Sequence, residues 1–333
     1  MMKIIRYILF PVVPIYFLVT WLRNKLYDLG IKSSKSYDFP VICVGNLSVG
    51  GTGKTPMIEY LIDLLNEEIK LATLSRGYKR KTKGFQLANK NSTADSIGDE
   101  PFQFYSKFKD LTMVAVDSNR HHGITRLRAS KPEVILLDDA LQHRKVKAGF
   151  NILLTTYKKP YYKDIVLPTG DLREPRSGAN RANIIMVTKC PNRLTDDEKN
   201  DILKRIKPKS YQSVFFSSIV YSDKLFSAND SLLLSELEDF VLVTGIANAE
   251  PLVAFLKAEN LTFEHFNFKD HHDFTQDDIH VLANKARILT TEKDFMRLKK
   301  FDSIANKLYY IPISIAIDNE LAFNNKIKTF IKH

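Results

Sequence analysis

Residues 41–60, VICVGNLSVGGTGKTPMIEY, decide the fold class of this chain. The apolar run Val41–Val44 is typical of a buried parallel strand, and apolar residues recur with helical spacing from Met57 onward. The glycine-rich segment Gly50–Thr55 joins the two. Glycines let backbone N–H groups turn toward an anion, and the start of a helix adds its positive end. The stretch therefore predicts a phosphate-binding loop.

The loop also gives individual residues expected roles. Lys54 would reach the β- and γ-phosphates of a nucleotide, and the Thr55 hydroxyl would ligate Mg²⁺. The strict pattern G-x-x-x-x-G-K-[ST] asks for glycine at position 48, where this chain has serine, so the match is incomplete. A turn of purely structural use is the alternative. The residues expected to bind the nucleotide are Ser48, Gly50, Gly51, Thr52, Gly53, Lys54 and Thr55.

Length and composition bound the remaining possibilities. A chain of 333 residues has room for two α/β domains, each with its own core. Its formal net charge of +11 favours an acidic partner, which includes nucleic acid, an anionic membrane surface and phosphorylated small molecules. Cys43 and Cys190 both lie in or next to apolar strand-like runs. They are therefore expected to be reduced, buried thiols in a cytosolic setting.

The N-terminal segment differs from the rest of the chain. Leu9–Leu22 is apolar apart from Thr20, contains prolines, and has basic residues on both sides. It is shorter than the about 20 apolar residues that a spanning helix needs, and no small-residue cleavage site of a signal peptide follows it. We expect a helix in or against the inner face of a membrane, with Tyr16 and Trp21 at the interface. A helix packed on the protein's own core is the alternative.

The second strong pattern is an apolar strand, Val134–Asp139, that ends in two acids. The carboxyl ends of parallel strands meet at one edge of a sheet, where such folds bind ligands. A carboxylate there can reach the Mg²⁺ held by Thr55, and we expect Asp139 to do so. Glu174 lies in a polar loop that returns to the same edge and is a candidate for a further contact with the metal region. Lone loop glutamates are more often only solvated.

Other polar residues also follow expected strands. Asp99 and Glu100 open a helix, where they either serve the chemistry or match the helix dipole. Arg120 could clamp a phosphate. The adjacent His121 and His122 have no second cluster at ligand spacing, so a metal site there is not expected.

The order of strand and helix patterns predicts an α/β fold with a P-loop NTPase-like, mostly parallel sheet flanked by helices. We expect an N-terminal membrane-associated helix at residues 1–30 and a P-loop nucleotide-binding domain at 31–212. A hairpin linker is expected at 213–239, from the strand-like runs Val214–Tyr221 and Lys224–Phe226. A second, smaller α/β domain is expected at 240–333, closing over the substrate cleft.

Taken together, these motifs resemble those of the tetraacyldisaccharide 4′-kinases, the lipid A 4′-kinases of Gram-negative bacteria. The resemblance spans most of the chain, and the phosphate loop of that family also lacks the first glycine. Ala140 is a departure, since the family usually has glycine there; the added side chain is small and little consequence is expected. The matching strings are Val44–Leu47, Gly50–Pro56, Ser75–Tyr78, Gly98–Pro101, Asp138–His143, Leu167–Glu174, Asp270–His271 and Thr291–Asp294.

The resemblance implies transfer of the γ-phosphoryl group of ATP, with Mg²⁺, to the 4′-hydroxyl of a tetraacyl glucosamine disaccharide 1-phosphate, the lipid A precursor. The enzyme would act on the cytoplasmic face of the cytoplasmic membrane, as a peripheral or monotopic protein. A basic chain with an apolar N-terminal segment suits an anionic lipid substrate. Neither nucleic acid nor an obligate protein partner is expected.

By the same resemblance, Asp99 is a candidate catalytic base, and His271 of the second domain assists it. Asp138 is the rival base, because it sits beside the metal-binding Asp139. The residues expected to line the substrate or phosphate region are Tyr78, Arg120, Gln142, His143 and Arg173.

A regulatory P-loop GTPase or ATPase switch at the membrane is the alternative function. Guanine-specific members usually read the base with an [NT]-K-x-D segment after a strand. Thr188–Pro191 begins this pattern but lacks the aspartate, and Thr291–Asp294 has the wrong spacing. The sequence therefore favours the kinase.

Overall fold

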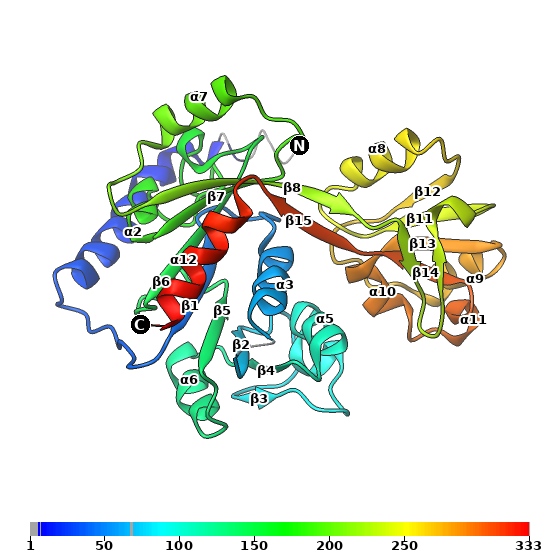
Figure 1. Cartoon of the computed structure of the whole chain (residues 1–333), viewed down its shortest axis with the longest axis horizontal. Helices are drawn as coiled ribbons and strands as arrows, with labels where there is room; N and C mark the ends of the chain where they lie inside the picture. Colours follow the sequence, from blue (N-terminus) through cyan, green and yellow to red (C-terminus); the bar gives the residue numbers. More distant parts are fainter. Residues whose placement is uncertain (1–5, 7, 67–68, 333) are drawn as a thin grey trace.

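Two β-sheets with helices packed on them organise the chain, in a computed structural model that describes residues 6, 8–66 and 69–332 (Figure 1). In the first sheet the strands from β8 to β4 pair in parallel, while the outer strands β15 and β3 are antiparallel. The expected mostly parallel α/β sheet is thus confirmed. In spatial order its strands are β15 (Ile313–Ile317), β8 (Ser213–Tyr221), β7 (Ile184–Thr188), β6 (Phe150–Thr156), β1 (Val41–Asn46), β5 (Val134–Asp138), β2 (Leu71–Ser75), β4 (Thr112–Val116) and β3 (Gln86–Leu87).

The strand order of this sheet reverses at β1. From β1 the sheet continues through β5, β2 and β4 in one direction and through β6, β7 and β8 in the other. A reversal of this kind opens a crevice at the carboxyl ends of the strands. The glycine-rich loop follows β1 directly, so the fold places it at this crevice.

Helices cover both faces of the first sheet because successive strand residues point to opposite sides. Cys43 packs into one buried cluster, whereas Ile42 and Val44 pack into the other. The Cys43 face is covered by α2 (Val13–Asp28), α6 (Arg120–Arg128) and α7 (Asp196–Ile206). The opposite face is covered by α3 (Lys54–Leu65), α5 (Asp99–Phe108) and the C-terminal α12 (Glu320–Lys332). Cys43 and Cys190 are both free and buried, as expected.

The second sheet is smaller and mixed. Its strands β14, β13, β11 and β12 pair in parallel, and β9 and β10 are antiparallel. In spatial order they are β10 (Ser231–Leu233), β9 (Lys224–Phe226), β14 (Leu308–Ile311), β13 (Arg287–Thr291), β11 (Phe240–Thr244) and β12 (Glu264–Asn267). The helices α8 (Glu250–Ala258), α9 (Gln276–Ala283), α10 (Glu292–Leu298) and α11 (Asp302–Ala305) pack on it.

The sheets differ from the expected organisation at two points. The expected hairpin between Val214–Tyr221 and Lys224–Phe226 does not form, because β8 pairs with β7 and β15 of the first sheet. Strand β9 instead forms a hairpin with β10 and also pairs with β14 of the second sheet. Residues 313–332 do not belong to the second sheet but return to the first as β15 and α12. We therefore call residues 6–221 and 313–332 the large unit, and residues 222–312 the small unit.

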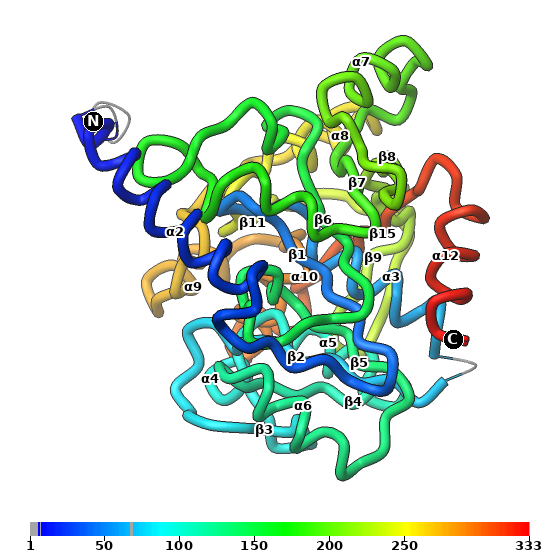
Figure 2. The backbone as a smooth tube through the Cα atoms, turned by 90° about the vertical axis from the view of Figure 1, so that its left-hand side faces the viewer, coloured from blue at the N-terminus to red at the C-terminus, as the bar shows by residue number. Residues whose placement is uncertain are grey.

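The N-terminal helix α2 lies on the outside of the large unit, on the side away from the small unit (Figures 1 and 2). A short 3₁₀ turn, Phe10–Val12, precedes it, and Pro14 lies in its first turn, where a missing N–H costs little. Asn24 is the only buried side chain that this helix contributes among the described residues. Within that part of the chain, no helix combines the length and the hydropathy needed to cross a bilayer.

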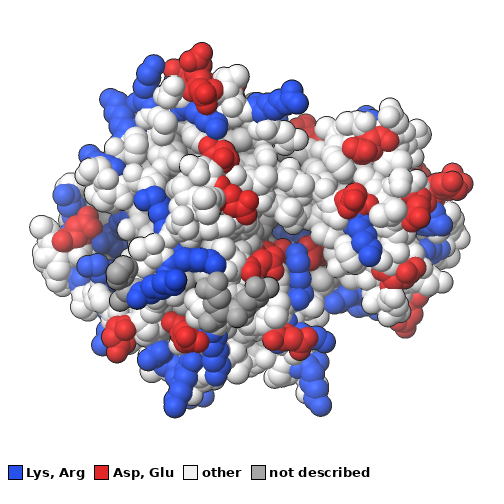
Figure 3. Space-filling model, in the orientation of Figure 1, with Lys and Arg blue, Asp and Glu red and all other residues white. Residues whose placement is uncertain are grey.

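Positive and negative side chains are interspersed over the face of the molecule shown in Figure 3. The excess of positive charge in the sequence is therefore not gathered into one patch on that face.

A buried ionic cluster joins the two units. Lys107 of α5 lies 2.6 Å from Glu59 of α3 and 3.8 Å from Glu292 of α10, measured from its Nζ to a carboxylate oxygen of each. Gln103 donates a hydrogen bond of 2.8 Å to Glu59. Burial, followed by the charge of Glu59, raises the pKa of Glu292 to about 7. The single ammonium group of Lys107 therefore lies near two buried carboxyl groups, and Glu292 loses its proton only near pH 7.

This cluster predicts a pH-dependent effect of Glu292→Gln on stability. A glutamate of the unfolded chain titrates near pH 4.3, so between that pH and about 7 folding takes up a proton at Glu292. The contribution of Glu292 to stability is present below this window and is lost as the pH rises through it. The variant should therefore gain free energy of unfolding relative to the wild type as the pH rises from about 4 to about 7, measured in urea.

The matched control is Glu259→Gln at the exposed end of α8, which should follow the wild type over the same range. A difference between Glu292→Gln and the wild type that stays constant from acid to neutral pH would contradict the assignment.

Candidate active site

The glycine-rich loop has the backbone that the sequence predicts. Gly50 and Gly53 have φ of +104° and +88°, a region that residues with a side chain rarely adopt. Helix α3 begins immediately afterwards at Lys54, and the Met57 amide donates to the Gly53 carbonyl at 3.2 Å. Ser48 is not in a left-handed conformation; it forms an antiparallel bridge with Leu172. This extended backbone explains why position 48 does not require glycine.

Both sides of the loop are held by neighbouring segments. Asn46 at the end of β1 donates to the Thr52 hydroxyl at 2.7 Å, and the Thr188 hydroxyl at the end of β7 donates to the Thr52 carbonyl at 2.8 Å. On the other side, the Val49 amide donates to the Asp171 carbonyl at 2.8 Å. The loop is therefore fixed before any ligand binds, which lowers the entropic cost of binding.

The acid-ended strand β5 meets the loop as expected. Val44 pairs with Asp138 in the parallel register, and the Asp139 amide donates to the Val44 carbonyl at 2.9 Å. The Asp139 carboxylate lies 3.8 Å from Lys54 and accepts two hydrogen bonds from Arg173, at 2.8 and 3.0 Å. Burial alone would raise the pKa of Asp139, but the charges of Lys54 and Arg173 outweigh it and lower the pKa. Arg173 also donates to Asn46 at the end of β1, so it lies beside the start of the loop.

Asp138 and Arg120 are both buried behind this edge. Burial, followed by the charge of Glu100, raises the pKa of Asp138 to about 7. Arg120 differs from the expected phosphate or substrate ligand, because its two terminal nitrogens donate to the Asp117 and Asp138 carbonyls and only 3% of the residue is exposed. Its role in this structure is to join the ends of β4 and β5.

Glu174 is held by donors from three segments. Its carboxylate accepts from Asn24 at 2.6 Å, from Gln142 at 2.9 Å and from Arg181 at 2.6 Å. Gln142 also donates to the Asn46 carbonyl at 2.8 Å, just before the loop. These contacts occupy Glu174 and Gln142, so the structure favours a supporting role for both under the loop over direct contact with a metal or substrate.

His143 and Tyr78 are less constrained. Burial and the charge of Arg120 lower the pKa of His143 to about 4, so its imidazole is neutral at pH 7. Tyr78 is 64% exposed, and its ring centre lies 6.1 Å from that of His271. Tyr78 is thus free to contact a ligand near His271.

Asp99 and His271 come together although they belong to different units. Asp99 is the first residue of α5, and His271 lies between β12 and α9; the distance from Asp99 Oδ2 to His271 Nδ1 is 3.4 Å. Burial would raise the pKa of Asp99, but the hydrogen bond with His271 and the charge of Arg297 outweigh it and lower the pKa. The structure therefore assembles an ionised carboxylate beside an imidazole.

Two basic residues of α10 complete this group, and the sequence did not assign them a role. Lys293 Nζ lies 3.0 Å from His271 Nε2, and Arg297 Nε lies 3.5 Å from Asp99 Oδ2. The string Thr291–Asp294 could have pointed to them, because it marks the start of α10. The Thr291 side chain caps this helix by accepting a hydrogen bond from the Asp294 amide. The cap fixes the helix start, and the helix then presents Lys293 and Arg297 one turn apart.

Lys189 is a further residue that sequence reasoning left without a role. A side-chain carbon added at Gly51 would lie 3.8 Å from Lys189 Nζ, so this lysine reaches the phosphate loop. Burial lowers the pKa of Lys189.

The oxygen atoms beside the loop fit Mg²⁺. Thr55 lies in the first turn of α3, next to Lys54, whose Nζ lies 3.8 Å from the Asp139 carboxylate. Asp138 Oδ1 is buried with no hydrogen-bond partner among the described residues. Mg²⁺ is bound in such sites by one or two carboxylates together with substrate phosphates and water. His121 and His122 are instead engaged by Tyr37 and Asp117, and no cluster of three or more potential ligands occurs in the described part of the chain.

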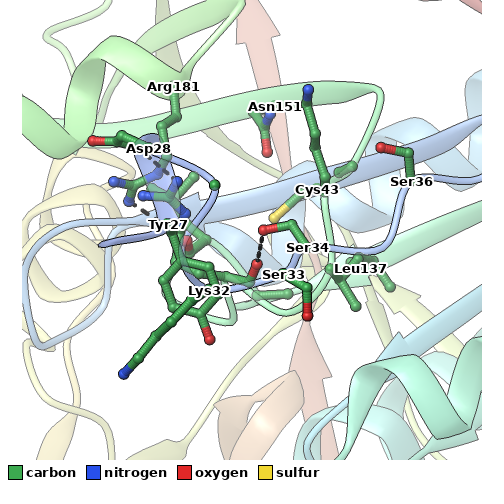
Figure 4. Close-up of a pocket in the computed structure, with 17 residues that line it drawn as sticks. Tyr27, Asp28, Lys32, Ser33, Ser34, Ser36, Cys43, Leu137, Asn151 and Arg181 are labelled. Carbon is green, nitrogen blue, oxygen red and sulfur yellow. Dashed lines mark hydrogen bonds and ion pairs between the residues drawn. The ribbon is translucent and has the colours of Figure 1, made fainter. Parts of the chain in front are cut away.

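A separate cavity of about 650 Å³ lies below the connection from α2 to β1 (Figure 4). Its apolar lining includes Cys43, Leu137 and Leu141, and Lys32 and Arg144 are among its basic residues. An apolar lining with basic groups can hold an amphiphile with an anionic head. Asp99 and His271 do not line this cavity.

The fold and the site together define a class: a phosphate-loop protein of the α/β type, built to hold a nucleoside triphosphate against a carboxylate edge. A family model described as tetraacyldisaccharide-1-P 4′-kinase matches residues 5–332. The chain therefore belongs to the tetraacyldisaccharide-1-phosphate 4′-kinase family, and the resemblance seen in the sequence is confirmed.

Individual relatives agree with this family. The chain is 51% identical to the tetraacyldisaccharide 4′-kinase of Flavobacterium johnsoniae, with 99% of this chain and 98% of the relative covered. It is 44% identical to that of Phocaeicola vulgatus, with 97% and 94% covered. A crystal structure of LpxK from Aquifex aeolicus in complex with ATP is 30% identical, with a TM-score of 0.78 and coverage of 98% and 99%.

The contacts of Glu174 predict that Glu174→Gln loses stability without changing the Mg²⁺ requirement. The variant leaves Arg181 without its counter-charge, which costs about 3 kcal/mol in the free energy of unfolding, measured in urea. The Mg²⁺ concentration for half-maximal phosphoryl transfer should match the wild type. Asp139→Asn is the comparison variant and should raise that concentration. A comparable rise for Glu174→Gln would restore Glu174 as a metal ligand.

Proposed function

We propose that this chain transfers the γ-phosphoryl group of ATP to the 4′-hydroxyl of a tetraacyl glucosamine disaccharide 1-phosphate. Membership of the kinase family supports the reaction. The single observation that carries the proposed chemistry is the contact of 3.4 Å between Asp99 and His271, made across the two units. A carboxylate presented in this way suits the removal of a proton from an acceptor hydroxyl.

The reaction needs alignment and charge stabilisation more than covalent chemistry from the protein. The acceptor oxygen bonds to the γ-phosphorus, the bond from that phosphorus to the β,γ-bridging oxygen breaks, and ADP leaves with the electron pair. The hydroxyl proton passes to the Asp99 carboxylate. The lowered pKa of Asp99 keeps this carboxylate ionised, and so able to accept the proton, at neutral pH.

The nucleotide is held by the loop that follows β1. The backbone amides of Gly50–Gly53 and the start of α3 bind the phosphates, and Lys54 contacts the β- and γ-phosphates. Thr55 and Asp139 would hold Mg²⁺, and Asp139 would do so through water because Arg173 donates to both of its oxygens; the ion would supply positive charge to the phosphate oxygens. Asp138 is the weaker candidate for the base because it is buried, with 3% of its surface exposed.

This proposal predicts that Asp99→Asn loses phosphoryl transfer but keeps nucleotide binding. The purified full chain should transfer labelled phosphate from ATP to the lipid disaccharide 1-phosphate in the presence of Mg²⁺. The variant removes the proton acceptor, so kcat should fall roughly 10²- to 10⁴-fold. The affinity for ATP, measured by titration calorimetry, should be unchanged because Asp99 does not belong to the phosphate loop.

Asp95→Asn is a suitable control, since its carboxylate is exposed and pairs only with the exposed Lys81 among the described residues. A wild-type chain that binds ATP but phosphorylates no lipid acceptor would refute the function. An Asp99→Asn variant with normal turnover would leave the function standing and remove Asp99 as the base.

The membrane surface is proposed as the place of action, with α2 as the contact. Ile15, Leu18, Val19 and Leu22 are all exposed, and their spacing of three and four residues places them along one stripe of the helix. A contiguous exposed apolar stripe is unfavourable in water and marks an interaction site. Tyr16, by contrast, packs against the large unit, where its hydroxyl donates to the Arg173 carbonyl at 3.0 Å. The helix therefore fits a position flat on a membrane, with one side on the protein.

The stripe predicts that Leu18→Glu with Leu22→Glu weakens membrane binding. Burying a leucine side chain contributes about 1.5–3 kcal/mol, so the double variant should lower vesicle partitioning at least tenfold. The measurement is sedimentation with vesicles that contain phosphatidylglycerol. Leu321→Glu, at an exposed leucine of α12, is the control. Unchanged sedimentation of the double variant would favour a helix that serves only the protein's own packing.

A regulatory GTPase or ATPase switch is not favoured. Relatives named as kinases cover nearly the whole chain. Thr188 supports the phosphate loop through its hydroxyl, so its place in the partial [NT]-K-x-D pattern has a structural explanation.

A further inference from the structure

We propose that Lys293 is a positioning residue that fixes the proton of His271 on Nδ1, where it faces Asp99. The inference rests on the proposed function, because it concerns the group that orients the catalytic carboxylate. Lys293 acts through His271 and need not touch the substrate.

The direction of the two hydrogen bonds follows from which atoms can donate. A lysine ammonium has three donors and no acceptor, so at 3.0 Å from Lys293 Nζ the His271 Nε2 atom must accept. A neutral imidazole carries one N–H, which is then on Nδ1. Nδ1 lies 3.4 Å from Asp99 Oδ2, and an ionised carboxylate only accepts. Lys293 therefore donates to His271, and His271 in turn donates to Asp99.

Asp270 makes the role of Lys293 specific. Its carboxylate lies 4.0 Å from His271 Nε2 and 3.8 Å from Lys293 Nζ. Without the lysine, Asp270 is the nearest acceptor for a proton on Nε2. The imidazole would then place its proton toward Asp270 and turn the lone pair of Nδ1 toward the carboxylate of Asp99, which would break the contact between them.

The remaining neighbours of His271 do not replace Lys293. Arg297 contacts Asp99 Oδ2 at 3.5 Å and donates to the His272 carbonyl at 3.1 Å, so it holds the carboxylate and the loop. Tyr78 meets the His271 ring edge to face, and 64% of the residue is exposed. Among the described residues, Lys293 is the group that bonds Nε2 from the donor side.

The backbone around Lys293 is rigid enough to enforce this geometry. Asp294, the next residue, is fully buried and accepts from the Gly245 amide at 2.9 Å and from the Thr291 hydroxyl at 2.8 Å. The His271 amide in turn donates to the Gly245 carbonyl at 3.0 Å. Gly245 thus ties the start of α10 to the loop of His271, and Lys293 and the imidazole are held at a defined separation.

The Oδ1 atom of Asp99 is the oxygen that this arrangement leaves available for the reaction. His271 and Arg297 both contact Oδ2, which leaves Oδ1 without a partner from the described part of the chain. With the carboxylate held through one oxygen, the other is presented to the acceptor hydroxyl in a fixed direction. A loss of the Nδ1 proton would leave Arg297 as the one contact to Oδ2 from the described residues, so the carboxylate would be held less firmly.

The test is the protonation pattern of the His271 ring, observed by long-range ¹H–¹⁵N NMR on the full chain with ¹⁵N-labelled histidine. His271→Gln identifies the signals. In the wild type, Nδ1 should be protonated and Nε2 should carry the lone pair. In Lys293→Met, Nε2 should gain a proton. Lys293→Arg keeps a cationic donor and should keep the wild-type pattern, and Lys300→Met, at an exposed lysine after α10, should not change it.

Kinetics provide an independent readout. Lys293→Met should lower kcat at least tenfold, since a wrong histidine tautomer can cost up to about 10⁴ in rate, while KM for ATP stays unchanged. In the His271→Gln background the same substitution should cost nothing further, because the lysine acts through the histidine. Thermal unfolding verifies that each variant is folded.

The inference is overturned if the wild-type ring carries its proton on Nε2, or if Lys293→Met leaves the ring pattern unchanged. It is also overturned if Lys293→Met lowers kcat equally with and without His271. A chain that phosphorylates no lipid acceptor refutes the proposed function instead, and in that case the ring pattern still decides the role of Lys293.

Discussion

The parallel register of β5 on β1 is the constraint on which the site depends. Because Val44 pairs with Asp138 and β1 ends two residues later at Asn46, the glycine-rich loop and the two acids lie at the same edge of the sheet. Adjacent carboxylates at such an edge repel each other unless cations or protons relieve the charge. Here Lys54 and Arg173 balance Asp139, while Asp138 is withdrawn from solvent. The pairing of β5 with β1 thus determines where the charged side chains of the proposed nucleotide site lie.

A second constraint acts between the units. Helix α5 begins with Asp99 and carries Lys107 two turns later, and α10 begins with Glu292 and presents Lys293 and Arg297 to the Asp99–His271 pair. The same two helices therefore contribute residues both to the buried ionic cluster and to the surroundings of the Asp99–His271 pair. Phe102 of α5 also packs against the core of the small unit. The contacts that hold the two units together therefore continue directly into the contact between Asp99 and His271.

The sequence predicted those features that depend on neighbours in the chain. The loop, the acid-ended strand and the free, buried cysteines follow from local patterns, and the pairing of Asp99 with His271 followed from the family resemblance. Arg120 and Glu174 could not be placed in this way, because their environments depend on packing. Arg120 follows a strand as a phosphate-binding arginine would, yet its donors are taken by backbone carbonyls. The donors to Glu174 come from segments as far away in the chain as Asn24.

The pairing partners of the strands also could not be predicted from the sequence. The runs at β8 and β9 are separated by only two residues in the sequence, and the assembled sheets show that they belong to different units. Helix α7 was missed although it carries a local signal, the capping box between Thr195 and Glu198. In the C-terminal helix α12, Phe323, Ile327 and Phe330 recur at spacings of four and three residues and mark a packed face, but this pattern does not say which sheet the helix covers.

The pairing of β8 with β15 has a consequence for how the small unit is built into the chain. Tyr221 and Ile313 are cross-strand partners, so the polypeptide leaves and re-enters the large unit at one place (Figure 1). The small unit is topologically an insertion into a complete α/β sheet, carried on a two-stranded ribbon. The phosphate loop lies wholly within the large unit, whereas the contact between Asp99 and His271 joins the two units. The position of the small unit on its ribbon therefore sets the distance between Asp99 and His271 and does not alter the backbone of the phosphate loop.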